Sequence, residues 1–199
     1  YLKLFHSNLM HNTNTPLVID FDGTLIDGDL LTDSIIANTK NNPFYIAKAI
    51  FRTVLGRCYI KHKMHEENDY LKYDQLKYNL TLINYINSQK NKRKEIIICT
   101  AANETAVQKI IDEIKDYIGI IEVIGSSRNT NLKGKNKAKY LTNRYGYKNF
   151  DYFGDSRSDV HVWKHADKKI LIGFGNSIPS YARIAGIRPI LNCKTCYLN

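Results

Sequence analysis

Short apolar runs recur along the chain and are separated by segments with helical spacing. Because their apolar residues follow one another without alternating, these runs are typical of strands buried on both faces of a parallel sheet. The first run begins at Leu17 and ends in two aspartates, Asp20 and Asp22. The other predicted strands cover residues 95–99, 121–124, 150–153, 169–172 and 188–191.

The segments between the runs show the spacing of amphipathic helices. The predicted helices cover residues 30–41, 43–57, 74–89, 103–117, 135–145 and 159–166. Asp74 is the expected cap of the third helix, and Gly146 is the expected end of the fifth. Residues 58–73 are polar and fit neither pattern. The alternation of strands and helices predicts an α/β, Rossmann-like parallel sheet with helices on both faces.

The order of the elements also predicts how the chain is divided. A helical insert at 30–73 separates the first strand from the rest of the sheet, so we expect it to form a lobe over the sheet edge where the strands end. The core is then made of residues 16–29 and 74–192. Residues 1–15 are expected to be a polar N-terminal extension, and residues 193–199 a C-terminal tail.

Polar side chains follow the ends of several predicted strands. Asp20 and Asp22 end the first strand, and Thr100 follows the second. Lys133 comes after the third strand, and Asp155 and Asp159 come after the fourth. Because parallel strands end at one edge of a sheet, these side chains should meet there. Clustered carboxylates call for a hard divalent cation such as Mg²⁺, and a lysine with a hydroxyl suits a phosphoryl group.

The same four segments resemble the motifs of the haloacid dehalogenase (HAD) superfamily, in the same order. The segment 20–24 matches DxDGT, Thr100 matches the hydroxyl of the second motif, 131–134 (NLKG) resembles the third, and 154–159 resembles GDxxxD. The residues of these motifs are most similar to those of the phosphoserine-phosphatase-like branch. It also resembles HAD domains that precede membrane prenyltransferases, which share NLKGxxKA.

This resemblance implies a catalytic role for each motif. Asp20 would be the nucleophile that forms an aspartyl phosphate, and Asp22 the general acid and base. The HAD dehalogenases lack an aspartate at the position of Asp22, so its presence favours phosphoryl chemistry. Thr100 and Lys133 would contact the phosphoryl group as catalytic residues. The full phosphate-binding set would be Phe21, Asp22, Gly23, Thr100, Ala101 and Lys133.

The resemblance also implies a metal site. Mg²⁺ would be held by Asp20, by the backbone carbonyl of Asp22, and by Asp155. Asp159, Ser156 and Lys137 would lie in the surrounding shell, with Asp159 binding a metal water or orienting the catalytic lysine. Lys137 is a second candidate for that lysine, because it follows Lys133 by four residues on the same helical face. Lys133 is preferred because it precedes Gly134, as in phosphoserine phosphatases.

Charge changes the expected partners. The chain carries 29 basic and 19 acidic residues, a net charge of +10, which favours phosphorylated substrates, nucleic acid or an anionic membrane surface. The basic runs lack the interleaved aromatic residues that stack on bases, so no nucleic acid is expected. No apolar segment reaches the ~20 residues that span a bilayer. Peripheral contact with an anionic membrane stays open, as does the oligomeric state.

The cysteines favour a reducing compartment. Cys99 lies in an apolar run, and Cys193 and Cys196 form a lone CxxC without a second pair of zinc ligands. Without a disulfide framework, a cytoplasmic protein is the better expectation, and secretion without a cleaved signal peptide is the alternative.

Three functions are compatible with these residues. The first is a Mg²⁺-dependent phosphatase for a small metabolite or for a phosphoprotein side chain such as phosphotyrosine. The second is a phosphotransferase or mutase that uses the same site. The third is a basic module that keeps the fold and binds anions or membranes. The intact aspartates favour an enzyme, and the helical insert stands where a substrate-selecting cap of the HAD superfamily belongs.

Overall fold

Six parallel strands form the central sheet, in the order β4-β3-β1-β5-β6-β7. The computed structural model describes residues 15–90, 95–120, 122–173, 179–187, 189–192 and 195–197. The strand β1 lies in the middle, where Val18 pairs with Ile97 of β3 and with Tyr152 of β5. The strands, all predicted from apolar runs, are β1 (Leu17–Ile19), β3 (Ile96–Asn103), β4 (Glu122–Ser126), β5 (Asp151–Gly154), β6 (Lys169–Gly173) and β7 (Pro189–Asn192).

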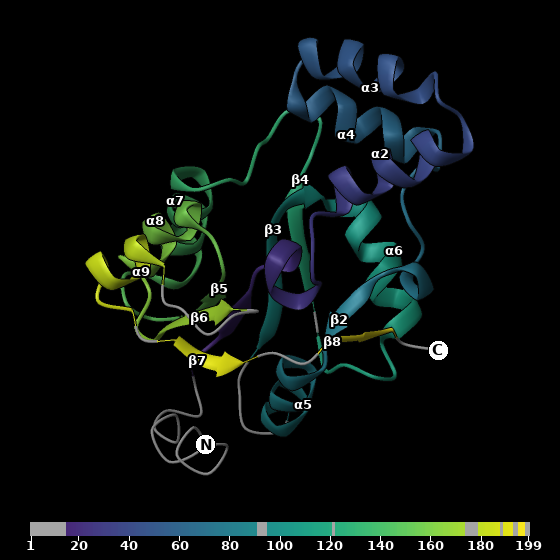
Figure 1. The fold of residues 1–199 in the computed structure, drawn as a ribbon. Coiled ribbons are helices and arrows are strands. Elements are labelled where there is room, and N and C mark those ends of the chain that lie inside the picture. The colour runs from purple at the N-terminus through teal and green to yellow at the C-terminus, as the bar shows by residue number, and fades with distance from the viewer. Residues whose placement is uncertain are drawn as a thin grey trace.

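Helices cover both faces of this sheet, as the alternating pattern predicted (Figure 1). Leu17 and Ile19 of β1 are fully buried in the larger apolar cluster, together with residues of α5 (Leu80–Gln89) and α6 (Glu104–Ile114). Val18 points to the other face and packs with residues of the remaining core helices. Those helices are α7 (Lys135–Tyr145), α8 (Val160–Trp163) and α9 (Ser180–Ile184).

The helix predicted for residues 74–89 is wrong in its first half. Asp74 lies in a short turn, Tyr73–Gln75 (η2), which is followed by the strand β2 (Lys77–Asn79). The helix α5 begins only at Leu80, and the side chain of Asn79 caps it by accepting from the Leu82 N–H at 3.0 Å. Strand pairing outweighs helical spacing here, because β2 pairs with β8 (Thr195–Tyr197) and Tyr78 is fully buried.

The insert forms three helices, α2 (Leu30–Asn41), α3 (Tyr45–Val54) and α4 (Arg57–Glu66). Figure 1 shows them together at the top of the molecule, over the end of the sheet near α6. The single helix predicted for 43–57 stops early, because Gly56 has a φ of 121° and separates α3 from α4. A small apolar cluster of Tyr45, Ala49, Ile60 and Met64 joins the two helices. We call this three-helix unit the cap.

Two further expectations concern the cysteines and the membrane. Cys99 is fully buried in β3, and this burial raises the pKa of its thiol to about 12. Cys193 lies outside the described residues, so the Cys193–Cys196 pair is not tested. Over the described ranges, no helix has the length and apolar character that a membrane span requires.

Candidate active site

Asp20 stands at the end of the central strand, where the chain leaves the sheet in a tight turn, Phe21–Leu25 (η1). Its carboxylate accepts a hydrogen bond from the Phe21 N–H at 2.8 Å, and the Ile26 N–H closes the turn on the Phe21 carbonyl at 3.1 Å. Gly23 within the turn has a φ of 68°, a conformation that side-chain-bearing residues rarely adopt. The turn therefore fixes Asp20 at the sheet edge.

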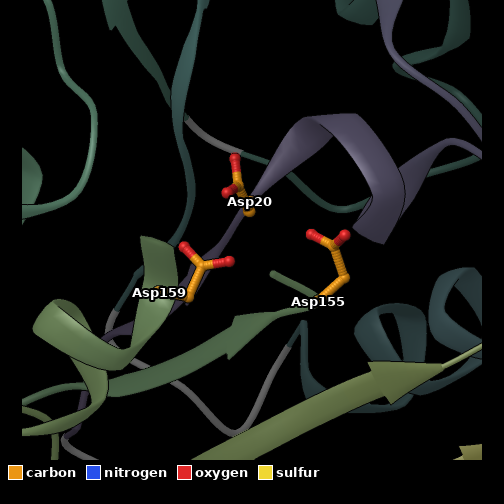
Figure 2. Close-up of side chains that lie close together, drawn as sticks. All are labelled: Asp20, Asp155 and Asp159. Carbon is orange, nitrogen blue, oxygen red and sulfur yellow. The ribbon is translucent and has the colours of Figure 1, made fainter. Parts of the chain in front are cut away.

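Three carboxylates meet beside this turn. Asp20 comes from the end of β1, Asp155 follows β5, and Asp159 comes from the turn Arg157–Asp159 (η3) before α8. Figure 2 shows these three side chains gathered around one space. One oxygen of each lies within 4.8 Å of the others. Carboxylate oxygens at this spacing are a donor set that fits a divalent cation.

The lysine at this cluster is Lys137, from the first turn of α7. Its Nζ lies 2.6 Å from Oδ2 of Asp20 and 3.8 Å from Oδ1 of Asp159, and its side chain is almost completely buried. Lys133, the lysine preferred from the sequence, is exposed. The structure therefore brings the second sequence candidate, rather than the first, into contact with Asp20.

Tyr152 is a member of the site that the motifs do not reveal. Its hydroxyl donates to Oδ1 of Asp159 at 2.7 Å and accepts from Nζ of Lys137 at 2.9 Å. It also lies 3.3 Å from Oδ2 of Asp20. Tyr152 is fully buried within β5. The available signal was a tyrosine in an apolar strand that leads directly into Gly154 and Asp155, since a buried hydroxyl requires a partner.

Burial and mutual repulsion alter the acidity of the cluster. Burial raises the pKa of Asp20 to about 6, against the opposing effect of Lys137. Burial, followed by the negative charges of Asp20 and Asp159, raises the pKa of Asp155 to about 8. Burial alone would lower the pKa of Lys137, but Asp20 and Asp159 outweigh it, so the lysine keeps its charge. One ammonium cannot offset three carboxylates, which favours binding of a further cation.

Asp22 occupies a different place from Asp20. Its Oδ1 accepts from the Leu30 N–H at 2.9 Å, where the cap begins, and it is not part of the three-carboxylate cluster. Burial, followed by the charge of Asp29, raises the pKa of Asp22 to about 7. Of the two motif aspartates, one therefore faces Lys137, and the other is a carboxyl group that carries a proton readily near neutral pH.

The remaining predicted residues surround these groups. Thr100 is fully buried and its Oγ1 accepts from the Ala102 N–H at 2.9 Å, which leaves its own hydroxyl proton free to donate. The Ala101 carbonyl accepts from Nζ of Lys61, a residue of the cap helix α4. Ser156 donates through its hydroxyl to Oδ2 of Asp159 at 2.8 Å. The side chain of Phe21 is buried in the larger apolar cluster, and its backbone N–H donates to the Asp20 carboxylate.

Gly23 gives a direct test of how tightly the turn packs on the cluster. A Cβ at Gly23 would lie 2.3 Å from Oδ2 of Asp155, whereas a Cβ at Gly56, another glycine with positive φ, would meet nothing within 4 Å. Both Gly23→Ala and Gly56→Ala should lose about 1–3 kcal/mol of unfolding free energy through backbone strain. Only Gly23→Ala should also weaken metal binding, because it displaces Asp155. Thermal melts with and without Mg²⁺ measure both effects, and an unchanged metal response in Gly23→Ala would contradict the close packing.

Comparison with known proteins identifies the fold. No family model matches the chain. An uncharacterized protein of Sinorhizobium fredii, y4nM, is 28% identical over 172 residues, which are 86% of this chain. The chain spans only 32% of that relative's length.

Solved structures are similar over most of the chain. A HAD-like family hydrolase from Streptococcus pneumoniae has a TM-score of 0.58 at 16% identity, with 88% of this chain and 92% of that one covered. A HAD family hydrolase from Salmonella enterica serovar Typhi has a TM-score of 0.57 at 14% identity, covering 80% and 62%. The chain has the HAD hydrolase fold. Phosphoserine phosphatase shares this HAD fold too, with a TM-score of 0.54 at 17% identity and coverage of 79% and 86%.

Proposed function

We propose that this protein is a Mg²⁺-dependent phosphatase that hydrolyses phosphomonoesters through an aspartyl phosphate. The observation that carries the proposal is the carboxylate of Asp20. It is fixed at the end of the central strand, is paired with the buried Lys137 at 2.6 Å, and stands beside two further carboxylates. The HAD fold and the acidic cluster support a phosphatase-type activity.

In the first half of the reaction, a carboxylate oxygen of Asp20 attacks phosphorus, and the bond from phosphorus to the leaving oxygen breaks. Asp22 gives its proton to that oxygen, so the alcohol leaves neutral. The raised pKa of Asp22, about 7, supports this role, because the group is protonated in a substantial fraction of molecules at neutral pH.

In the second half, Asp22 takes a proton from water, whose oxygen attacks the phosphorus of the aspartyl phosphate. The bond from phosphorus to Asp20 breaks, which releases inorganic phosphate and regenerates the free carboxylate. The ion pair with Lys137 keeps Asp20 ionised for the next cycle, since the ammonium opposes the effect of burial on its pKa. Tyr152 holds Lys137 in place through the contact between its hydroxyl and Nζ at 2.9 Å.

Phosphate oxygens would be held by the hydroxyl of Thr100 and by backbone N–H groups of the turn after Asp20. Mg²⁺ would be held by Asp20, Asp155 and the Asp22 carbonyl, with Asp159 close enough to join them. When bound, the cation supplies positive charge to the phosphoryl oxygens. Lys133 stays a candidate for an outer contact with the substrate, because it is exposed.

The proposed substrate is a small phosphorylated metabolite or a phosphoprotein side chain such as phosphotyrosine. The cap stands over the sheet edge, and its Lys61 reaches the Ala101 carbonyl beside Thr100. A cytoplasmic, reducing location remains our prediction.

Metal removal tests the proposal most directly. We expect hydrolysis of p-nitrophenyl phosphate in Mg²⁺, loss of that activity in EDTA, and its return when Mg²⁺ is restored in excess. The values of kcat/KM for phosphoserine, phosphotyrosine peptides and phosphosugars then rank the substrate classes. Turnover that is indifferent to EDTA would contradict the metal, and the absence of turnover on every ester would contradict the phosphatase.

A further inference from the structure

The outer face of α3 is apolar and exposed to solvent. Five large side chains on and beside this helix follow one another at helical spacing, and between 53% and 84% of the surface of each is accessible: Phe44, Ile50, Phe51, Val54 and Leu55. We call these five residues the α3 ridge. Figure 1 shows α3 at the outer end of the cap, away from the sheet. Within the described part of the chain, the ridge stays exposed to solvent, and exposed patches of this kind mark interaction sites.

The inward face of the same helix is mixed, because Ala49 packs in the apolar cluster of the cap while two neighbouring buried residues make polar contacts. Arg52 is buried, forms an ion pair with Glu67 and lies 4.0 Å from Asp69. The Tyr45 hydroxyl donates to Asp69 at 2.7 Å. These contacts fix the rotation of α3 about its axis. The apolar residues are therefore held outward by specific polar contacts on the other side.

The segment that contains the ridge has an unusual charge. Residues 34–65 include six lysines and arginines and no aspartate or glutamate. Among the described residues, Lys40 at the end of α2 and Arg57 at the start of α4 are exposed and have no ion-pair partner. These two residues flank α3 in the chain, one before the ridge and one after it. The ridge is thus bordered by free positive charge.

We propose that the cap docks on an anionic lipid bilayer, with the α3 ridge entering the boundary between headgroups and acyl chains. Lys40 and Arg57 would then contact the phosphates of the headgroups. A bilayer suits a protruding ridge, because it needs no complementary groove. Self-association through the same face suits it less, because a two-fold contact would bring two copies of this basic, acid-free segment together. The proposal does not depend on the catalytic chemistry.

Vesicle co-sedimentation with the full chain tests this docking. We expect binding to phosphatidylcholine vesicles that contain phosphatidylglycerol, and little binding to phosphatidylcholine alone. The triple substitution Phe44→Ser, Phe51→Ser and Val54→Ser should lower the affinity by at least about tenfold, because it removes most of the inserted apolar surface. The matched control replaces three exposed side chains elsewhere, Tyr117, Tyr147 and Ile184, with serine and should bind as the parent does. Thermal melts confirm that both variants fold.

A second pair of variants tests the charge. Lys40→Gln with Arg57→Gln should weaken binding about fivefold per cation. The control, Lys115→Gln with Lys139→Gln, removes the same charge from exposed positions outside the cap and should have a smaller effect. Equal binding of ridge variant and parent would overturn the proposal. So would binding that ignores phosphatidylglycerol, or a dimer in analytical ultracentrifugation that the ridge substitutions dissociate while vesicles are not bound.

Discussion

Asp20→Asn should lower the turnover of p-nitrophenyl phosphate by about 10⁴-fold or more. The amide cannot attack phosphorus as a carboxylate does, so the aspartyl phosphate does not form. The substitution also removes the negative charge that pairs with Nζ of Lys137 at 2.6 Å. Steady-state kinetics in saturating Mg²⁺ measure the loss. Mass spectrometry after an acid quench should find phosphate on the peptide that contains Asp20 in the parent and not in the variant.

Asp27→Asn is the matched control for this experiment. Asp27 is an exposed carboxylate seven residues further along the chain, outside the three-carboxylate cluster. It should keep nearly full activity, because its side chain contacts neither the cluster nor Lys137. Appreciable turnover in Asp20→Asn would exclude the covalent route. Phosphate recovered on a different peptide would assign the nucleophile elsewhere.

The second large effect is expected for Lys137→Met. This substitution removes the buried ammonium that contacts Asp20 and Tyr152, and it leaves three carboxylates without their cation. Breaking a buried pair in this way costs about 3–5 kcal/mol. We expect kcat to fall about 10³-fold and the melting temperature to drop in EDTA. Mg²⁺ should restore part of the stability, because it returns positive charge to the cluster.

Lys133→Met separates this role from that of the neighbouring candidate. Lys133 is exposed, so its removal should leave the melting temperature unchanged in EDTA. Any effect should appear in KM, as expected for an outer contact with the substrate. If Lys133→Met abolished activity while Lys137→Met stayed active, Lys133 would be the catalytic lysine, as the motif favours. The contact of Lys137 with Asp20 would then be only structural.

The reason that Lys137, rather than Lys133, contacts Asp20 lies in helix geometry. Side chains of an α-helix tilt toward its N-terminus, so a residue within the first turn covers the space in front of the helix. Lys137 reaches Asp20 in this way, while Lys133 precedes Gly134 at the start of α7. The spacing of the sequence places both lysines near the site. The spacing does not reveal the path of the loop before α7, and this path determines which of the two lysines contacts Asp20.

The sheet was predictable because each core strand is a continuous apolar run, and the acidic edge because parallel strands end together. The strand β2 was not predictable in the same way. Its three residues lie within a segment of helical spacing, and their partner β8 lies more than a hundred residues later in the chain. Tyr152 was missed for a related reason, since only the packing of β5 against α7 shows which buried group its hydroxyl meets.

The strand β8 is connected through β2 to the turn that follows Asp20. β8 pairs with β2, and β2 in turn holds the residues just after the turn, through a bridge between Tyr78 and Ile26 and a hydrogen bond from the Asp27 N–H to the Lys77 carbonyl at 2.8 Å. Removal of residues 195–197 should therefore disturb the position of Asp22 through β2, without involving the six-stranded sheet. The pairing of β8 with β2 therefore contributes to the position of the segment where the cap meets the core.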